Sequence, residues 1–415
     1  MQININSETG KLEAVILHTP GQELENMTPE TVQRALYSDI LNLNVVLEEY
    51  RQFSEVLSKL TKTYEVSSLL VDVLNDEKLK TNLVNRICTS ENVFEIREFL
   101  LELSPQELGR QLIEGVVMKK ESLTKFLSKD KYSLQPLHNF FFTRDSAIAI
   151  GERALISRMA NHVRQRESVI MELILANHPE FSAKTVNPEF YPGFLPEITI
   201  EGGDILVARE DILLIGSSIR TSTQGIDFII DQFKERKLER DIIIQELPAS
   251  PESFIHLDMV FTFLDRDTCM VYEPLILKPN KYQTIHVHLK NGKVQFIESV
   301  ENIPSVLHKL GMEIKALKCG GSKDVWIQER EQWHSGANFF AVAPGKVIGY
   351  GRNLYTMEEL NKAGYEIVHS EDVIEGEINI DDYKKCVITI DGSELSRGGG
   401  GARCMTMPLK RETIY

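Results

Sequence analysis

Short pairs of apolar runs, each joined by a tight turn, recur from about residue 138 to the end of this chain of 415 residues. Each pair begins with a polar residue or glycine, a pattern typical of β-hairpins. Four pairs are RDSAIAIGERALISRM, GGDILVAREDILLIGSS, LDMVFTFLDRDTCMVYEP and GANFFAVAPGKVIGYGRN. A fifth can be assembled from KLEAVILHTP near the start and ARCMTMPL near the end. Repetition of one unit favours a radial or solenoid arrangement over one open sheet, with several unrelated hairpins as the alternative.

A different pattern separates the first of these segments from the others. Thr28-Pro29 matches a helix N-cap followed by proline, and apolar residues then recur every three or four positions as far as Leu60. The stretch Ser104-Pro105-Gln106-Glu107 is a capping box. We therefore predict a helical insertion over residues 28–131 and one α/β catalytic domain formed by residues 1–27 and 132–415.

The charge balance and the cysteines restrict the class of protein. Lys plus Arg is 46 and Asp plus Glu is 61, and the net charge of −15 disfavours binding to nucleic-acid backbones. No secretory signal and no apolar stretch long enough to span a bilayer is present in the sequence. The five cysteines are scattered without a CxxC pair, which favours reduced thiols in the cytoplasm over disulfides or a zinc site.

Acidic residues stand at the heads of three of the predicted pairs. Asp145 heads the first pair, Glu201 precedes two glycines at the second, and His256 and Asp258 open the third. In a strand that begins at His256, the imidazole and the carboxylate of Asp258 would share one face, as a general acid/base and its charged partner would. A surface ion pair and ordinary turn residues are the alternative interpretation.

A cysteine follows the most unusual stretch, RGGGGARCMTMP. Four consecutive glycines are costly to order, so they form either a flexible linker or a loop whose backbone must come close to something. A thiolate beside a histidine suits acyl transfer, but that reaction needs hydrogen-bond donors rather than acids around the developing oxyanion. A guanidinium is planar and cationic, and carboxylates bind it well. The residues therefore indicate that the sulfur of Cys404 attacks a guanidinium carbon.

The chain resembles the bacterial arginine deiminases of the guanidino-group-modifying (pentein) superfamily. The matching stretches are SETGKLEAVILHTPGQELENMTPE, FFFTRD, EGGD, GSSIRTS, FIHLDMVFT, CGG followed by REQWHSGAN, and ELSRGGGGARCMTMP, in the family's order from Ser7 to Pro408. The resemblance implies an α/β fold, a five-bladed ββαβ propeller with an inserted α-helical bundle. It also implies hydrolysis of L-arginine to L-citrulline and ammonia in arginine catabolism, without a metal or an organic cofactor.

The resemblance further implies a role for each motif residue. Cys404 would be the nucleophile that forms an S-alkylthiouronium, His256 the general acid/base, and Asp145, Asp258 and Glu201 the acids that bind the guanidinium. The substrate-binding residues that it implies are Asn139, Phe142, Arg164, Arg220, Arg397 and Gly399, with Arg158 and Arg166 as alternatives to Arg164. It implies L-arginine as the small-molecule partner, a homo-oligomer, no nucleic-acid or membrane partner, and a cytoplasmic location.

One departure and three alternatives remain open at this level. Some members carry a long side chain within the glycine run, so here Arg397 or Arg403 would have to compensate. An agmatine deiminase or an amidinotransferase could use the same scaffold, but agmatine has no carboxylate for Arg164 and Arg220 to bind. A catalytically silent binding protein is disfavoured because the thiol, the histidine and the three acids are all present.

Overall fold

All five predicted pairs of apolar runs form antiparallel strand pairs in the structure, a computed structural model that describes residues 1–29, 31–32, 36–37, 39–181, 183–193 and 195–415. Four of the pairs are β5 (Ala147–Ile150) with β6 (Arg153–Ile156), β8 (Ile205–Arg209) with β9 (Ile212–Ser217), β11 (Phe261–Asp265) with β12 (Thr268–Val271), and β16 (Phe340–Ala343) with β17 (Lys346–Tyr350). The fifth pair joins the two ends of the chain, β1 (Leu12–Leu17) with β20 (Met407–Arg411).

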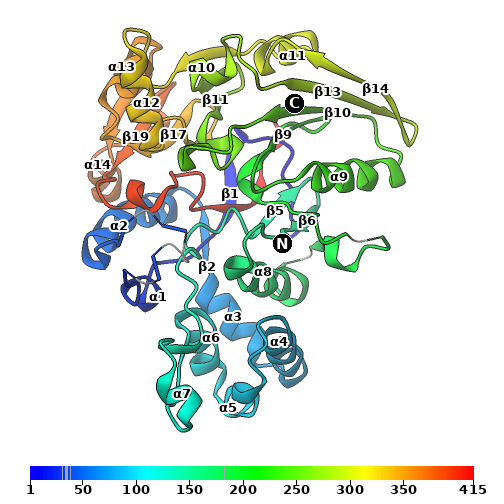
Figure 1. Ribbon diagram of the computed structural model, residues 1–415. Helices are drawn as coiled ribbons and strands as arrows, with labels where there is room; N and C mark the ends of the chain where they lie inside the picture. The colour runs from blue at the N-terminus through cyan, green and yellow to red at the C-terminus, as the bar shows by residue number, and fades with distance from the viewer. Residues whose placement is uncertain (30, 33–35, 38, 182, 194) are drawn as a thin grey trace.

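Each antiparallel pair gains a strand that runs parallel to one of its members after a helical connection. These parallel partners are β2 (Lys62–Glu65), β7 (Lys184–Val186), β10 (Arg240–Glu246), β15 (Lys315–Lys318) and β19 (Cys386–Ile390). The main connecting helices are α2 (Leu43–Leu60), α8 (Gln165–Asn177), α9 (Thr223–Glu235), α10 (Glu273–Ile276), α11 (Ile303–Lys309), α13 (Leu354–Lys362) and α14 (Ser370–Glu375). Five sheets therefore share one connectivity, which makes the fold mixed α/β (Figure 1).

Three strands extend these sheets at their edges, and a small separate sheet completes the set. β13 (Thr284–Lys290) and β14 (Lys293–Val300) continue the sheet of β8, β9 and β10, while β18 (Glu366–His369) pairs with β19. β3 (Val116–Val117) pairs only with β4 (Tyr132–Leu134) among the described residues. No helix in the described part of the chain is long and apolar enough to span a bilayer.

The helices of residues 66–127 gather apart from most of the sheets, at the bottom of Figure 1. They are α3 (Val66–Leu74), α4 (Glu77–Ser90), α5 (Arg97–Glu102), α6 (Pro105–Glu114) and α7 (Leu123–Leu127). The predicted helix start at Ser104 is confirmed, because the hydroxyl of Ser104 accepts a hydrogen bond from Glu107 N at the start of α6. The Glu107 carboxylate bonds Arg110 and Gln111, so the reciprocal half of the capping box is not among its hydrogen bonds. Within residues 28–131, β2 pairs with β1 and α2 packs on α14, while the predicted domain boundaries themselves stay a prediction.

Two local predictions are wrong. Thr28-Pro29 does not begin a long helix: Thr28 closes a short turn onto Thr31, and α2 begins only at Leu43, where Asn42 Oδ1 accepts from two free backbone N–H groups. His256 does not begin a strand either. It precedes a short 3₁₀ turn over Leu257–Met259, because the backbone N–H of Leu257 bonds the Asp204 carboxylate rather than a neighbouring strand.

Candidate active site

A single cavity of about 750 Å³ collects most of the predicted site residues. Its walls include Asn139, Phe142, Asp145, Arg164, Arg220, His256, Arg397, Gly399 and Cys404. The two predicted residues that do not line it, Glu201 and Asp258, are buried directly behind His256 and Cys404. Residues that lie far apart in the sequence, such as Asn139 and Cys404, thus meet in one cavity.

The repeated unit explains this convergence. Asp145 lies just ahead of β5, Glu201 ahead of β8, His256 ahead of β11 and Cys404 ahead of β20. In the first three pairs the residue occupies the loop that enters the first strand, and Cys404 occupies the loop that enters β20, the strand of its pair that has no parallel partner strand among the described residues. The fourth pair delivers Asn338 from the corresponding loop ahead of β16, and its side chain reaches Cys404. The sequence reasoning missed Asn338, although the equivalence of the repeat heads would have identified it.

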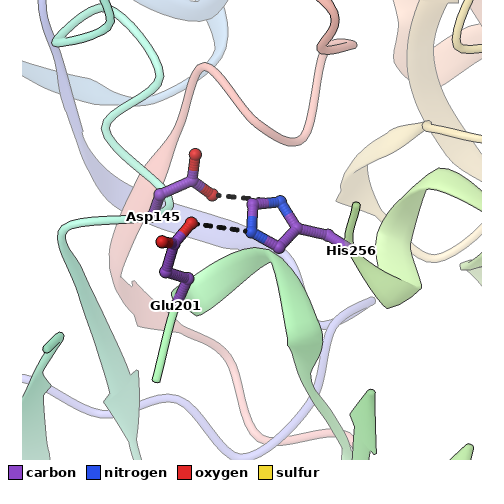
Figure 2. A group of neighbouring side chains, drawn as sticks. All are labelled: Asp145, Glu201 and His256. Atoms are coloured by element: carbon purple, nitrogen blue, oxygen red, sulfur yellow. Dashed lines mark hydrogen bonds and ion pairs between the residues drawn. The ribbon is translucent and has the colours of Figure 1, made fainter. Parts of the chain in front are cut away.

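The imidazole of His256 lies between two carboxylates (Figure 2). Nε2 is 3.0 Å from Glu201 Oε2, and Nδ1 is 3.6 Å from Asp145 Oδ1. Burial by itself lowers the pKa of His256, but the charge of Asp145 and the hydrogen bond to Glu201 outweigh it and raise that pKa to about 9. His256 therefore carries a proton at neutral pH and can donate it. A side chain at Gly203 would place its Cβ 2.5 Å from His256 Nδ1, so this position requires glycine.

Glu201 is fixed by several contacts besides the histidine. Its Oε1 accepts from the backbone N–H of Ala160 at 3.0 Å and lies 3.6 Å from Arg220 Nη1. Burial raises the pKa of Glu201, whereas the positive charges of Arg220 and His256 lower it, and the net result is a pKa of about 2. Glu201 is therefore a carboxylate throughout the neutral range. Together with Asp145 and His256 it forms the one group of possible metal ligands found among the described residues.

The thiol of Cys404 is buried in acidic surroundings. Sγ lies 3.8 and 3.9 Å from the two oxygens of Asp258, and Asn338 Nδ2 approaches it to 3.2 Å. Burial, followed by the negative charges of Asp258 and Asp145, raises the pKa of Cys404 well above that of a free cysteine. The sulfur is therefore protonated at neutral pH, and a cation placed between these carboxylates would favour the thiolate.

Asp258 is held in place from behind by Arg403. Arg403 Nη1 donates to Asp258 Oδ2 at 2.8 Å, and Nε and Nη2 donate to Glu8 at 3.0 and 3.1 Å. Because Arg403 is buried against these acids, it does not line the cavity or compensate there for a missing loop side chain. Arg397 does line the cavity, and its guanidinium pairs with Asp39 and Glu394.

The three candidate arginines of residues 158–166 differ in their contacts. Only Arg164 lines the cavity: its Nη1 lies 2.7 Å from Asp145 Oδ2, and its other nitrogens bond Glu167. Arg158 bonds Gln165 and approaches Glu189, while Arg166 pairs with Glu91. The geometry therefore favours Arg164, and its role in binding substrate stays a prediction.

The glycine run approaches aromatic and polar side chains closely. A Cβ at Gly400 would lie 2.5 Å from the Phe142 ring, and one at Gly401 would lie 2.6 Å from Asn338 Oδ1. Gly399 has a φ of +84°, a conformation that side chains other than hydrogen disfavour. The four glycines thus serve a loop whose backbone lies against the cavity wall, rather than a linker.

Comparison with known proteins identifies the family. Residues 33–411 match the family model described as arginine deiminase. An arginine deiminase of Bacillus cytotoxicus is 34% identical over 433 residues, covering 99% of both chains, and one of Listeria monocytogenes is 33% identical over 430 residues, covering 99% of this chain and 98% of the relative.

Solved structures carry the same fold at much lower identity. A dimethylarginine dimethylaminohydrolase of Pseudomonas aeruginosa is similar with a TM-score of 0.51 and 15% identity, over 96% of this chain and 99% of that one. The N-terminal domain of ArgZ, a cyanobacterial arginine dihydrolase, is similar with a TM-score of 0.53 and 13% identity, over 97% and 99% of the two chains. With the whole chain matched by curated relatives, the protein belongs to the arginine deiminase family of hydrolases.

Proposed function

We propose that the protein hydrolyses L-arginine to L-citrulline and ammonia, with Cys404 as nucleophile and His256 as general acid and base. The observation that carries this proposal is that a buried thiol and an imidazole line one cavity, which Asp145, Glu201 and Asp258 back. Three carboxylates suit a planar cation and oppose an oxyanion. The guanidinium carbon is then the atom that the sulfur can reach.

Substrate binding activates the sulfur. The arginine cation offsets the negative charges of Asp145 and Asp258, so the thiol of Cys404 loses its proton to solvent and becomes a thiolate. The thiolate forms a C–S bond with the guanidinium carbon. Protonated His256 gives its proton to one terminal amino group, which leaves as ammonia, and a cationic S-alkylthiouronium remains on Cys404.

Hydrolysis reverses the role of the histidine. Neutral His256 takes a proton from a water molecule, and the hydroxide forms a bond with the same carbon. When the C–S bond breaks, the electron pair returns to sulfur as thiolate, and loss of the hydroxyl proton leaves the urea group of citrulline. With a pKa of about 9, His256 enters the first step protonated, and taking the proton of the water molecule in the second step returns it to that form.

The amino-acid end of the substrate lies toward Arg220, Arg164 and Asn139 in this proposal. Arg220 lines the cavity, and its buried Nη1 makes no hydrogen bond in the described structure. Nη1 can therefore donate a hydrogen bond to the carboxylate of the substrate. Arg164 is engaged by Asp145 and Glu167 and would contribute mainly positive charge. Phe142, Gly399 and Arg397 are proposed to complete the walls around the substrate.

The test is to incubate purified protein with EDTA and either L-arginine or agmatine, and to quantify ammonia, citrulline and carbamoylputrescine. We expect citrulline and ammonia from arginine alone. Turnover of agmatine at a comparable rate would contradict the roles of Arg220 and Arg164, because agmatine lacks the carboxylate. A folded protein that turns over neither compound would contradict the whole proposal.

Four further features belong to the same proposal. The five sheets of common connectivity are arranged around one axis as propeller blades, supported by the convergence of their leading loops on one cavity. Residues 28–131 form the inserted part.

The five unpaired cysteines, all buried, support a cytoplasmic location. Association into a homo-oligomer completes the proposal and is tested by sedimentation of the purified protein.

A further inference from the structure

Asn338 reaches the reacting sulfur from the fourth strand pair. The residue is fully buried in the loop between α12 (Val325–Trp333) and β16, and its Nδ2 lies 3.2 Å from Cys404 Sγ. The same amide nitrogen lies 3.1 Å from the backbone oxygen of Asp258. Its oxygen, Oδ1, accepts from the backbone N–H of Arg403 at 2.9 Å.

These contacts determine which way the amide points. The backbone N–H of Arg403 can only donate, so the atom facing it must be the amide oxygen, and the NH₂ group must face the sulfur. The carbonyl of Asp258 can only accept, so it takes one of the two amide hydrogens. The second hydrogen faces two sulfur atoms, and Cys404 Sγ at 3.2 Å is nearer than Met259 Sδ at 3.7 Å.

We propose that Asn338 is a catalytic residue that donates a hydrogen bond to the sulfur of Cys404 and stabilises its thiolate form. This inference rests on the proposed role of Cys404 as nucleophile. A neutral amide, unlike a cationic donor, does not compete with the substrate cation for Asp145 and Asp258. The bond acts twice, on the thiolate before it attacks and on the thiolate that leaves when the thiouronium is hydrolysed.

Few groups favour a thiolate at this sulfur. Asp258 and Asp145 disfavour it by like charge, whereas a backbone hydrogen bond from Gly401 and then the positive charge of Arg403 favour it. The guanidinium of Arg403, however, donates its hydrogen bonds to Glu8, Asp258 and a backbone carbonyl, not to the sulfur. Among the described residues, Asn338 is the one whose side chain donates a hydrogen bond to Cys404 Sγ.

The experiment measures how the alkylation of Cys404 by iodoacetamide depends on pH. Trypsin releases the residue in the peptide Cys404–Lys410, so mass spectrometry follows this thiol separately from the other cysteines. Only the thiolate reacts, and a hydrogen bond to a charged group contributes enough to shift an ionisation by about one pH unit or more. We expect the half-maximal rate of Asn338→Ala to move to higher pH by about that amount. Asn338→Asp, which keeps the oxygen and replaces the donor by a carboxylate, should move further.

A matched control comes from Gln332, another buried amide. Its Nε2 donates to the carbonyls of Ser253 and Met259 but does not reach the sulfur. Gln332→Ala should therefore leave the pH profile of Cys404 alkylation where it is in the unchanged protein. Circular dichroism melting establishes that each variant is folded, and Asn338→Ser replaces an Asn338 variant that is not.

Coincident alkylation profiles for Asn338→Ala and the unchanged protein would overturn the inference, as would an equal shift in Gln332→Ala. Because alkylation does not use arginine, this outcome is separate from a failure of the proposed reaction. With L-arginine we also expect kcat/KM of Asn338→Ala to fall by about 10- to 100-fold, since the donor acts on a charged atom. A loss of less than twofold would contradict the proposed contribution.

Discussion

Replacing Arg403 by methionine tests whether the ion pairs beneath Cys404 stabilise the centre of the protein. The buried guanidinium donates to Glu8 at 3.0 and 3.1 Å, to Asp258 at 2.8 Å and to the carbonyl of Ile205 at 2.7 Å. Methionine has a comparable length but no donor, so Glu8 and Asp258 would lose their shared cation. Removing one partner of a buried ion pair costs about 3–5 kcal/mol, and we expect the free energy of unfolding of Arg403→Met to fall by that amount.

Because of Glu8, the loss of stability in Arg403→Met should also depend on pH. Burial raises the pKa of Glu8, but Arg403 outweighs burial and holds it at about 2, compared with 4.5 for an unperturbed glutamic acid. A lowered pKa contributes stability that is present above pH 4.5 and is lost as the pH falls toward 2. A shift of this size corresponds to about 3 kcal/mol. We therefore expect Arg403→Met to lose less stability than the unchanged protein when the pH is lowered from 5 to 3.

Urea unfolding followed by far-ultraviolet circular dichroism at pH 7, 5 and 3 measures both effects. The control is the double variant Glu8→Gln/Arg403→Met, which removes one of the two unpaired carboxylates and should recover part of the lost stability. The reasoning is refuted if Arg403→Met stays within about 1 kcal/mol of the unchanged protein, a cost typical of an ordinary single substitution. It is also refuted if the double variant is less stable than Arg403→Met.

Four shorter predictions concern the site. Cys404→Ala should form no citrulline and keep its melting temperature, and citrulline production by the folded variant would remove Cys404 from the reaction. Arg220→Ala should raise KM for L-arginine at least tenfold with a smaller change in kcat, since a charged hydrogen bond to the substrate is lost; an unchanged KM in steady-state assays would contradict this role. Gly203→Ala should lower kcat, because its Cβ would lie 2.5 Å from His256 Nδ1, and full activity would show that the ring can move. His256, whose pKa is raised to about 9, contributes stability that is present below pH 6.5 and lost as the pH rises through 9, so the melting temperature should fall over this range in the unchanged protein and less in His256→Gln.

The repeated strand pairs and the heads of three of them could be read from the sequence. Alternating apolar runs with tight turns are local patterns, and all five pairs formed where the pattern placed them. The helix start at Thr28 and the strand start at His256 were wrong. The helix begins instead where Asn42 caps α2, a second capping signal that the sequence also contains, whereas the turn after His256 depends on Asp204, a residue distant in the sequence.

Local pattern also failed to distinguish the arginines of the site. Arg158, Arg164 and Arg166 lie within nine positions of one another, and only the tertiary contacts of Arg164 with Asp145 and Glu167 distinguish it from the other two. Arg403, two residues beyond the glycine run, points away from the cavity into the acidic cluster of Glu8 and Asp258. Which charged group a long side chain meets depends on neighbours that sequence spacing does not encode.

The sequence by itself determined the strand pairs, the residues at their heads and, through its motifs, the family. Only the tertiary structure decided how those heads meet and what holds them: Asn338 reaches Cys404 across 66 positions, and Arg403, behind Asp258, pairs with Glu8 across 395. The physical reason is that strand and turn formation depends on neighbouring residues, whereas burial, hydrogen bonding and pKa depend on the groups that packing brings within a few ångströms.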